Sequence, residues 1–395
     1  MKIKVYIAPC GIGLGHVRRM DALAKSLRMF GVNDIIFSTY GVGYQYLSKL
    51  YCNECIYKSP EIDLIFNENG YFDFHNTIIR YGVISLYRFI KQFGYEMSRI
   101  QTFKPNVVVS DSRLSSTLAS WIIGIPTITV LNQLNVEIPR VRPMSFITKI
   151  VKRVSERFTF EIFSFLWARS NNIVVTDYPP PYTISRMNTM VHQRYKDRFK
   201  LIGPLLLLDL MKLPSKEEAR EILGFKSPVI VVILSGNKLE RNIAHVKLLP
   251  SLIKLAKLGY TVVEIGALNS FIPQVNNFYS YPFVDDVYIY MKAADVAIST
   301  GGQTTLAELM KIGIPIIGIP PIGHTEKMGN ASIIERLGLG VVKPLQKVTD
   351  DLDVLVSKVL YNDTYADRAI KVSREVNKYK GVITLSKMII NSKED

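Results

Sequence analysis

Short apolar runs alternate along this chain with longer stretches whose apolar residues recur at helical spacing. The runs predict buried strands, and the longer stretches, such as Arg18–Phe30 and Ser115–Ile123, predict helices that cover them. The alternation predicts an α/β protein with parallel sheets covered on both faces. The predicted strands form two series: Lys2–Ala8, Asp34–Ser38, Asn106–Ser110, Thr127–Leu131 and Ile173–Thr176, then Val229–Leu234, Thr261–Ile265, Val296–Ser299 and Ile314–Ile319.

The two series predict two domains, since 395 residues exceed one ordinary core. A Leu-rich run after Gly203-Pro204 gives way at Ser215 to a polar helix start. We therefore place an N-terminal domain at residues 1–205 and a C-terminal domain at 215–395, with the last helix a candidate to cross back to the first domain. Ligands of such sheets bind beyond the carboxyl ends of the strands, which predicts a cleft between two doubly wound domains.

Charge points to an anionic partner. The net charge is +15 and the isoelectric point is near 9.5, which suits nucleic acid, an acidic membrane or a phosphorylated substrate. Segment 140–170 carries seven Lys or Arg against two Glu, interleaved with aromatic and aliphatic residues. It predicts docking on an anionic membrane surface, or else an amphipathic helix whose apolar face is core. No nucleic-acid-binding motif accompanies the charge, so nucleic acid is not expected as a partner.

The sequence does not favour a membrane-spanning, a secreted or a metal-binding protein. No apolar run approaches the roughly 20 residues of a membrane span, and the first residues predict a strand rather than a secretory signal. We expect a cytoplasmic protein, at most peripheral on the inner face of the cell membrane. Cys52 and Cys55 lack further zinc ligands, which leaves two thiols or a local disulfide. Asp351 and Asp353 fall in a polar helical pattern rather than at a strand end, so no metal site is predicted.

A Gly-Gly loop carries the strongest chemical signal. Gly301 and Gly302 stand between a predicted strand and a helix, where bare N–H groups and the helix N-terminus suit a phosphate. Glu308 is misplaced beside a phosphate but suits the hydroxyls of a ribose, so the loop predicts a nucleotide-diphosphate site. Glu308 also has the spacing of a capping box with Thr305. The other wall is expected from a turn at the end of another strand, Ser235-Gly236-Asn237.

The first loop, Gly11 to His16, joins the first strand to a helix. Its glycines resemble a dinucleotide fingerprint, but the second strand has no acid at its end, which disfavours NAD. His16 is placed to act as a base or to bind a substrate hydroxyl; a helix cap or a solvated side chain is the alternative. Asp111 ends another strand and is the base, the partner of His16, or the N-cap of the helix near Arg113.

Several blocks resemble a known family. Tyr281 to Asp286, Met291 to Val296 and Ser299 to Pro320 are similar to the C-terminal half of GT-B glycosyltransferases, particularly the MurG-type family 28. The Gly-Leu-Gly-His-Val-Arg-Arg loop at residues 13–19 resembles that family's N-terminal loop. The resemblance implies that uracil lies against Phe283 and Val284, ribose against Glu308, diphosphate against Gly302, Gln303 and Thr304, sugar near His324 and Asn330, and acceptor near Gly13, Gly15 and His16.

The resemblance implies a GT-B fold of two Rossmann-like domains and transfer of a hexose or N-acetylhexosamine from a UDP-sugar to a lipid-linked or glycan acceptor. Position 300 is Thr, where retaining GT-B enzymes often carry a second glutamate, so we expect inversion. With no metal site at a strand end, we expect helix and loop amides to stabilise the leaving group, and no cofactor. The alternatives are a PseG-like nucleotide-sugar hydrolase, a UDP-N-acetylglucosamine 2-epimerase and a non-catalytic nucleotide-sugar-binding protein.

Overall fold

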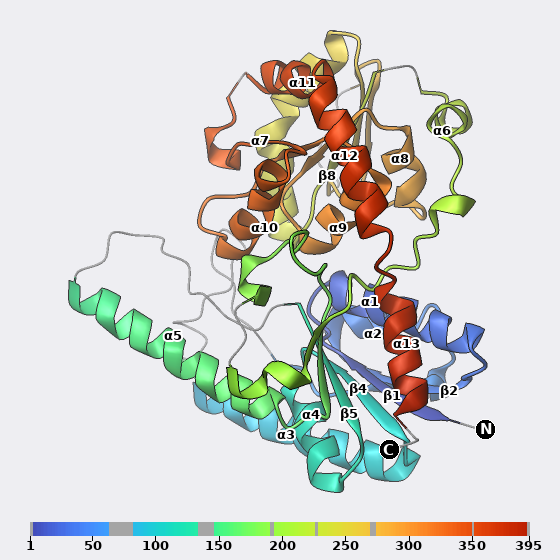
Figure 1. Ribbon diagram of the computed structural model, residues 1–395, viewed down its shortest axis with the longest axis vertical. Coiled ribbons are helices and arrows are strands. Elements are labelled where there is room, and N and C mark those ends of the chain that lie inside the picture. Colours follow the sequence, from blue (N-terminus) through green and yellow to red (C-terminus); the bar gives the residue numbers. More distant parts are fainter. Residues whose placement is uncertain are drawn as a thin grey trace.

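Two parallel sheets form the framework of the protein. The computed structural model describes residues 3–62, 82–132, 146–189, 193–225, 228–268, 274–349 and 351–392. Within these residues the N-terminal sheet has the strand order β3-β2-β1-β4-β5-β6-β7 and the C-terminal sheet β10-β9-β8-β11-β12-β13, with every pairing parallel. Figure 1 shows the two sheets, with their helices, as separate halves.

The N-terminal domain surrounds its sheet with helices. Its strands are β1 (Lys4–Pro9), β2 (Asp34–Thr39), β3 (Ile56–Lys58), β4 (Val107–Asp111), β5 (Thr127–Leu131), β6 (Asn172–Val175) and β7 (Phe199–Leu201). Its helices are α1 (Leu14–Met29), α2 (Gly41–Leu47), α3 (Gly82–Phe103), α4 (Leu114–Ile123) and α5 (Phe146–Trp167). Strands β4 and β5 are buried along their whole length, as expected for a sheet covered on both faces.

The C-terminal domain repeats this arrangement. Its strands are β8 (Val229–Ile233), β9 (Thr261–Ile265), β10 (Phe278–Tyr281), β11 (Val296–Ser299), β12 (Ile316–Gly318) and β13 (Gly340–Val342). Its sequence also supplies α6 (Lys216–Leu223), α7 (Lys238–Lys257), α8 (Val287–Ala293), α9 (Gln303–Ile312), α10 (Thr325–Arg336), α11 (Leu352–Leu360), α12 (Asp363–Val376) and α13 (Gly381–Asn391). Helix α6 begins with the polar stretch noted in the sequence, and Ser215 and Glu218 form its capping box.

The doubly wound α/β architecture predicted from the sequence is confirmed, and its nine expected strands are all present, six of them with shifted ends. Four strands were not expected: β3, β7, β10 and β13. Each has three or four residues and lies at an edge of its sheet, so it lacks the long apolar run by which a central strand is identified.

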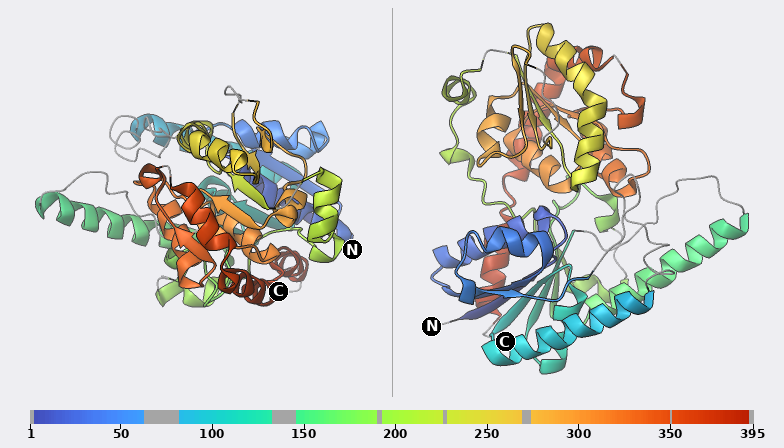
Figure 2. Two further views of the ribbon diagram at one scale, coloured as in Figure 1. Left: turned by 90° about the horizontal axis from the view of Figure 1, so that it is seen from above. Right: turned by 180° about the vertical axis from the view of Figure 1, so that it is seen from behind.

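Two segments of the chain cross from one domain to the other: the last helix, α13, and the segment that follows β6. Helix α13 packs on α1: Val382, Leu385 and Ile389 belong to the N-terminal core, and Ser386 hydrogen bonds to Ser26 at 2.8 Å. Figures 1 and 2 show this last helix lying against the N-terminal domain. In the other direction, Tyr178 follows β6 but is buried in the C-terminal core. These crossings fix the two sheets relative to one another.

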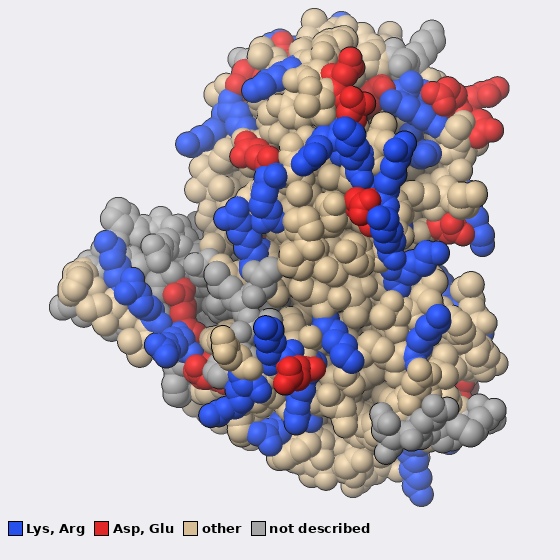
Figure 3. Space-filling view, viewed as in Figure 1, with Lys and Arg blue, Asp and Glu red and all other residues tan. Residues whose placement is uncertain are grey.

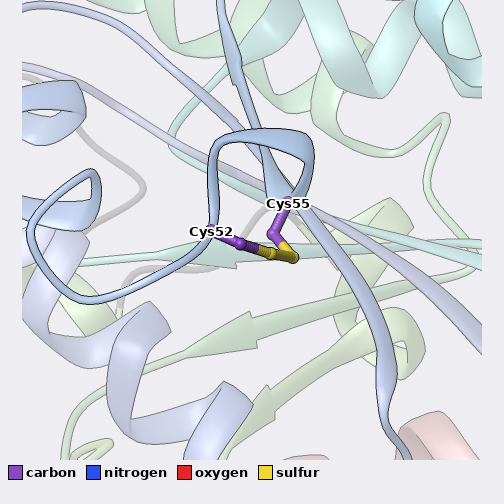
Figure 4. Close-up of a disulfide and its surroundings, with 2 residues drawn as sticks. All are labelled: Cys52 and Cys55. Carbon is purple, nitrogen blue, oxygen red and sulfur yellow. A yellow bond between two sulfur atoms is a disulfide. The ribbon is translucent and has the colours of Figure 1, made fainter.

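Cys52 and Cys55 form a disulfide in the turn before β3, which decides between the two states left open by the sequence (Figure 4). The turn lies at the edge of the N-terminal sheet, because β3 is the edge strand. None of the helices in the described part of the chain has the length and apolar character needed to cross a membrane.

We expect Leu385→Ala to destabilise the N-terminal domain, because it leaves a cavity where a helix from the end of the chain completes the core. The loss for a buried leucine is about 2–5 kcal/mol of unfolding free energy, measured by urea denaturation. Lys387→Ala on the exposed face of α13 is the control and should change stability by less than about 0.5 kcal/mol. Equal stability of the two variants would contradict the packing of α13 described above.

Candidate functional site

The carboxyl ends of β1 and β4 bring two predicted residues together. Pro9 of β1 pairs in register with Asp111, the last residue of β4, and the loop after β1 leads into α1. Gly13 is the N-cap of α1 with φ 78°, and a Cβ atom at Gly13 or Gly15 would meet no atom within 4 Å. The first turn of α1 therefore faces open space beside the end of β4.

His16, Arg19 and Asp111 form a cluster at this edge. His16 Nδ1 lies 2.9 Å from Asp111 Oδ1, and Arg19 Nε donates to Asp111 Oδ2 at 2.6 Å. Arg19 also donates to Thr176 Oγ1 at 3.2 Å, beyond the end of β6. His16 and Arg19 share one face of α1 because they are three residues apart.

The cluster makes Asp111 a permanent anion. Burial raises the pKa of Asp111, but the charges of Arg19 and His16 outweigh it and lower the pKa to about 2. Its side chain is 0% exposed, whereas that of His16 is 21% exposed. The suggested N-cap role of Asp111 is wrong: Arg113 is the N-cap of α4, and the Asp111 carboxylate turns toward α1 instead.

The His16 ring is oriented by these contacts. Arg19 Nη2 also approaches Nδ1, at 2.8 Å, but a guanidinium only donates, so it bonds to the ring only when Nδ1 is unprotonated. With the proton on Nδ1, the ring donates to Asp111, and Nε2 is left as the acceptor. In this tautomer His16 has the geometry of a general base whose orientation a buried carboxylate fixes.

In the C-terminal domain the Gly-Gly loop joins β11 to α9. Gly302 is the N-cap of α9 and makes no side-chain cap hydrogen bond, so the first N–H groups of the helix point outward uncapped by a side chain. Gly301 has φ 89°, and a Cβ atom there would lie 2.7 Å from Lys327 O. The suggested capping box of Thr305 and Glu308 is wrong, because both residues lie inside the helix. Such an N-terminus is an anion site.

The turn at Ser235 lies against this loop. Ser235 Oγ and Thr300 Oγ1 are 2.8 Å apart, and Ser235 N donates to Thr300 Oγ1 at 3.0 Å. Lys327 of α10 donates to Ser235 O at 2.8 Å and pairs with Glu240 of α7. Asn237 is the N-cap of α7, where it accepts from Glu240 N. A small pocket is lined by Ser235, Thr300, Glu240 and Lys327. The structure thus places the two glycine-containing turns side by side, as expected for two walls of one site.

Glu308 lies on α9 two turns beyond the loop, between helices of both domains. Tyr288 of α8 donates to Glu308 Oε1 at 3.0 Å. Burial raises the pKa of Glu308 to about 7, while the positive charge of Arg18 from α1 and the Tyr288 hydrogen bond act against it. Phe283 and Val284 precede α8, and the Phe283 ring is exposed. Asp286 is the N-cap of α8. The segment expected near a base therefore adjoins the carboxylate expected near a ribose.

Helix α10 forms the remaining wall. His324 is its N-cap, and burial together with the Lys327 charge lowers the pKa of His324 to about 4, so the ring is neutral at pH 7. Asn330 donates to Gly301 O at 3.3 Å. Desolvation by the surrounding protein raises the pKa of Glu326, while the charges of Lys327 and His16 oppose the rise. Glu326 therefore lies within electrostatic reach of His16.

Three buried polar atoms on α9 and α10 have no hydrogen-bond partner among the described residues: Gln303 Nε2, Thr325 Oγ1 and Asn330 Oδ1. Buried polar atoms normally have partners, so an unpaired set in one place marks a ligand position. Thr304 is exposed at the same helix terminus. These atoms combine donors and acceptors, as recognition of a polar, hydroxyl-rich ligand requires.

Several residues of the site were not assigned from the sequence. Arg19 and Lys327 carried a usable signal, because each lies three residues from a predicted site residue and on the same helix face. Glu240, three residues after Asn237, and Glu326, four residues before Asn330, carried a similar signal. Tyr288 carried none, because it reaches the site only through the packing of α8 on α9. Asp351 and Asp353 lie at the start of α11 and pair with Lys343 and Lys254. Among the described residues no group of three or more His, Cys, Asp or Glu side chains is arranged to hold a metal ion.

Comparison with known proteins identifies glycosyltransferases as the relatives of this chain. Residues 254–383 match the glycosyltransferase family 28 C-terminal domain. An uncharacterized glycosyltransferase of Methanosarcina acetivorans is 27% identical over 399 residues, covering 98% of each chain. The UDP-N-acetylglucosamine--N-acetylmuramyl-(pentapeptide) pyrophosphoryl-undecaprenol N-acetylglucosamine transferase of Caldicellulosiruptor saccharolyticus is 21% identical over 317 residues, covering 76% of each.

Solved structures share the fold. The calicheamicin glycosyltransferase CalG4 superposes with a TM-score of 0.68 at 13% identity, covering 99% of this chain and 98% of that one. MurG of Acinetobacter baumannii gives 0.61 at 16% identity, covering 99% and 100%. Fold and comparisons together define a GT-B glycosyltransferase, and the predicted GT-B fold is confirmed. Within that class the match of residues 254–383 assigns the C-terminal domain to glycosyltransferase family 28, and the chain is similar over most of its length to other glycosyltransferases.

We expect Glu308→Gln to stabilise the ligand-free protein above pH 7. The folded-state pKa of about 7 exceeds the ordinary glutamate value of about 4.3, so stability falls as pH rises from about 4.3 to 7 and the loss persists above it. Glutamine removes this loss, worth roughly 2–3 kcal/mol at pH 8 and nothing near pH 4. Urea unfolding at both pH values measures it. The exposed Glu221→Gln variant is the control, and parallel behaviour of the two variants would refute the raised pKa.

Proposed function

We propose that this glycosyltransferase moves a hexose or N-acetylhexosamine from a UDP-sugar to a lipid-linked acceptor, with inversion and without a metal ion. The observation that carries the proposal is the position of the His16–Asp111 pair opposite the Gly-Gly loop. Glu326 and Arg18 link the two sides electrostatically, since Glu326 acts on His16 and Arg18 acts on Glu308. In such an arrangement, a sugar donor bound to the C-terminal domain lies next to a base on the N-terminal domain.

The donor side supports a nucleoside diphosphate. The uncapped N-terminus of α9 suits the phosphates, and the Glu308 carboxylate suits two ribose hydroxyls. The exposed Phe283 ring and the loop before α8 supply a surface for the base. The unpaired atoms of Gln303, Thr325 and Asn330 supply partners for sugar or phosphate oxygens. Uracil remains the proposed base on the strength of the family resemblance.

The chemical step is a single displacement. His16 Nε2 takes the proton of the acceptor hydroxyl as its oxygen bonds to the anomeric carbon, and the bond from that carbon to the diphosphate oxygen breaks. Both electrons of that bond leave with the diphosphate, whose charge falls on the N-terminus of α9. Asp111 stabilises the imidazolium that forms. Asp111 itself is a poor base, because its pKa is about 2 and its carboxylate is committed to Arg19 and His16.

Inversion is favoured by what occupies position 300. Thr300 uses its hydroxyl to join the Ser235 turn to the Gly-Gly loop, so this position holds a structural contact instead of a carboxylate. A double displacement needs a nucleophile on the face of the sugar opposite the leaving group. Donor-side geometry therefore supports direct attack by the acceptor.

Helix α5 supports a membrane-bound acceptor. Helix α5 forms most of segment 140–170, and residues 140–145 of that segment lie outside the described residues. Phe146, Ile150 and Val154 are exposed at four-residue spacing, and so are Lys149, Arg153 and Arg157, which gives parallel apolar and basic stripes. Figure 3 shows basic side chains along this protruding helix. The alternative of a core-facing helix applies to its other end, where Trp167 is buried.

The test incubates the protein with UDP-sugars labelled in the sugar, with and without a lipid extract. The proposal expects transfer only when the extract is present. Free sugar without any acceptor would identify a hydrolase, an isomerised nucleotide sugar an epimerase, and tight binding without turnover a sensor. Each of these three results overturns the proposal.

His16→Ala should lower kcat at least a hundredfold while leaving donor affinity within about threefold, because the ring acts on the acceptor proton. Titration calorimetry with UDP measures the affinity, and product formation measures kcat. Glu308→Ala is the matched donor-side variant and should instead weaken UDP binding. A His16→Ala enzyme with a near-normal rate would remove the ring from the chemical step.

Replacing Lys149, Arg153 and Arg157 by glutamine should weaken binding to vesicles of phosphatidylglycerol and phosphatidylcholine. Each basic residue near an anionic surface is worth about 1 kcal/mol, so the three together predict roughly a hundredfold loss in sedimentation assays. A control variant replaces Lys247, Lys257 and Lys358, which are exposed on the other domain. If both triple variants bind equally, net charge rather than α5 governs the attachment.

A further inference from the structure

The N-terminal domain contains a buried ion pair, Arg113 with Glu96, that has no role in the site as described so far. Arg113 Nη2 donates to Glu96 Oε1 at 2.6 Å, and both side chains are almost completely buried. Glu96, on α3, also accepts from Tyr6 at 2.8 Å and from Ser38 at 2.7 Å. A buried ion pair adds little net stability compared with apolar packing, so its geometry rather than its energy is informative.

Arg113 is separated from Asp111 by one residue of backbone. Ser112, which separates them, has φ 53°, a left-handed conformation that a side-chain-bearing residue adopts at a cost. The Arg113 guanidinium donates to Ser38 O at 2.5 Å and to Ser59 Oγ at 3.1 Å, near the ends of β2 and β3. The guanidinium is thus anchored to other strands of the sheet, and this anchoring fixes the turn that carries Asp111.

The same guanidinium is connected to the loop that carries His16. It lies over the Tyr40 ring, 5.5 Å from the ring centre, and Tyr40 Oη is 3.4 Å from Cys10 Sγ. A Cβ atom at Gly11 would be only 2.1 Å from Tyr40 O, so the loop rests directly on the Tyr40 backbone. Gly43 N also donates to Gly11 O at 3.3 Å.

We propose that Arg113, held by Glu96, is a positioning residue that sets the distance between His16 and Asp111 by fixing both of their loops at once. The assignment of a catalytic role to the pair rests on the proposed function, but the positioning itself does not. The charged groups that face the His16 ring are Asp111 of β4, Arg19 of its own helix and Glu326 of α10. Displacement of Asp111 alone removes the anion that stabilises the charged ring.

The test is an NMR measurement of the His16 ring in Arg113→Lys, with the signals assigned by comparison with His16→Gln. Lysine keeps the positive charge opposite Glu96 but loses the planar fork that reaches Ser38 and Ser59. We expect the Nδ1 resonance of His16, which reports its contact with Asp111, to move from the wild-type position and kcat to fall at least tenfold, with UDP affinity within twofold. Because the NMR measurement needs no substrate, it can succeed even if the proposed reaction is wrong.

Two further variants separate positioning from general destabilisation. Glu264→Gln breaks another buried pair, with His245 in the C-terminal domain, and should leave the Nδ1 resonance of His16 and kcat unchanged. Ser59→Ala deletes one contact of Arg113 and should fold in any case, giving a smaller change of that resonance in the same direction. A folded Arg113→Lys with an unaltered His16 resonance overturns the proposal. If Arg113→Lys does not fold, an unaltered resonance in Ser59→Ala does so.

Discussion

The packing of α13 on α1 is the constraint on which the site depends. The His16–Asp111 pair belongs to one sheet and the Gly-Gly loop to the other, so neither domain alone contains both. A helix at the end of the chain completes the core of the first domain, and Tyr178 of the first domain enters the core of the second. These reciprocal crossings hold two separate cores at a fixed distance, and the opposing walls of the cleft inherit that distance.

Charge within the site is set by burial and by neighbours rather than by residue type. Asp111 and Glu308 are both carboxylates, but two adjoining cations give the first a pKa of about 2, and burial gives the second one of about 7. His324 has its pKa lowered to about 4. The candidate site therefore contains three different electrostatic environments. Asp111 stays charged beside His16, Glu308 titrates near neutral pH, and His324 is a neutral imidazole at the N-terminus of α10. The raised pKa of Glu308 costs stability at neutral pH, as is typical of functional sites, whereas the lowered pKa of Asp111 adds to stability.

The central strands and the Gly-Gly loop were predictable from the sequence because both depend on local patterns: apolar runs, and glycine between a strand and a helix. The edge strands were not, because they are short and half covered. The site was predictable only as far as its residues follow strand ends. Both rejected capping roles were errors of local reasoning, since Asp111 and Glu308 make tertiary contacts that spacing alone does not reveal. Tyr288 and Arg113 carry no local signal, because their partners lie on other elements of the chain.

Tyr178 has a mechanical consequence. Its hydroxyl donates at 3.0 Å to the carbonyl of Ala307, the residue next to Glu308 on α9. A separation of the two domains therefore pulls on the same helical turn that carries the proposed ribose-binding carboxylate. This hydrogen bond therefore ties the position of Glu308 on α9 to the segment by which the chain leaves the first domain.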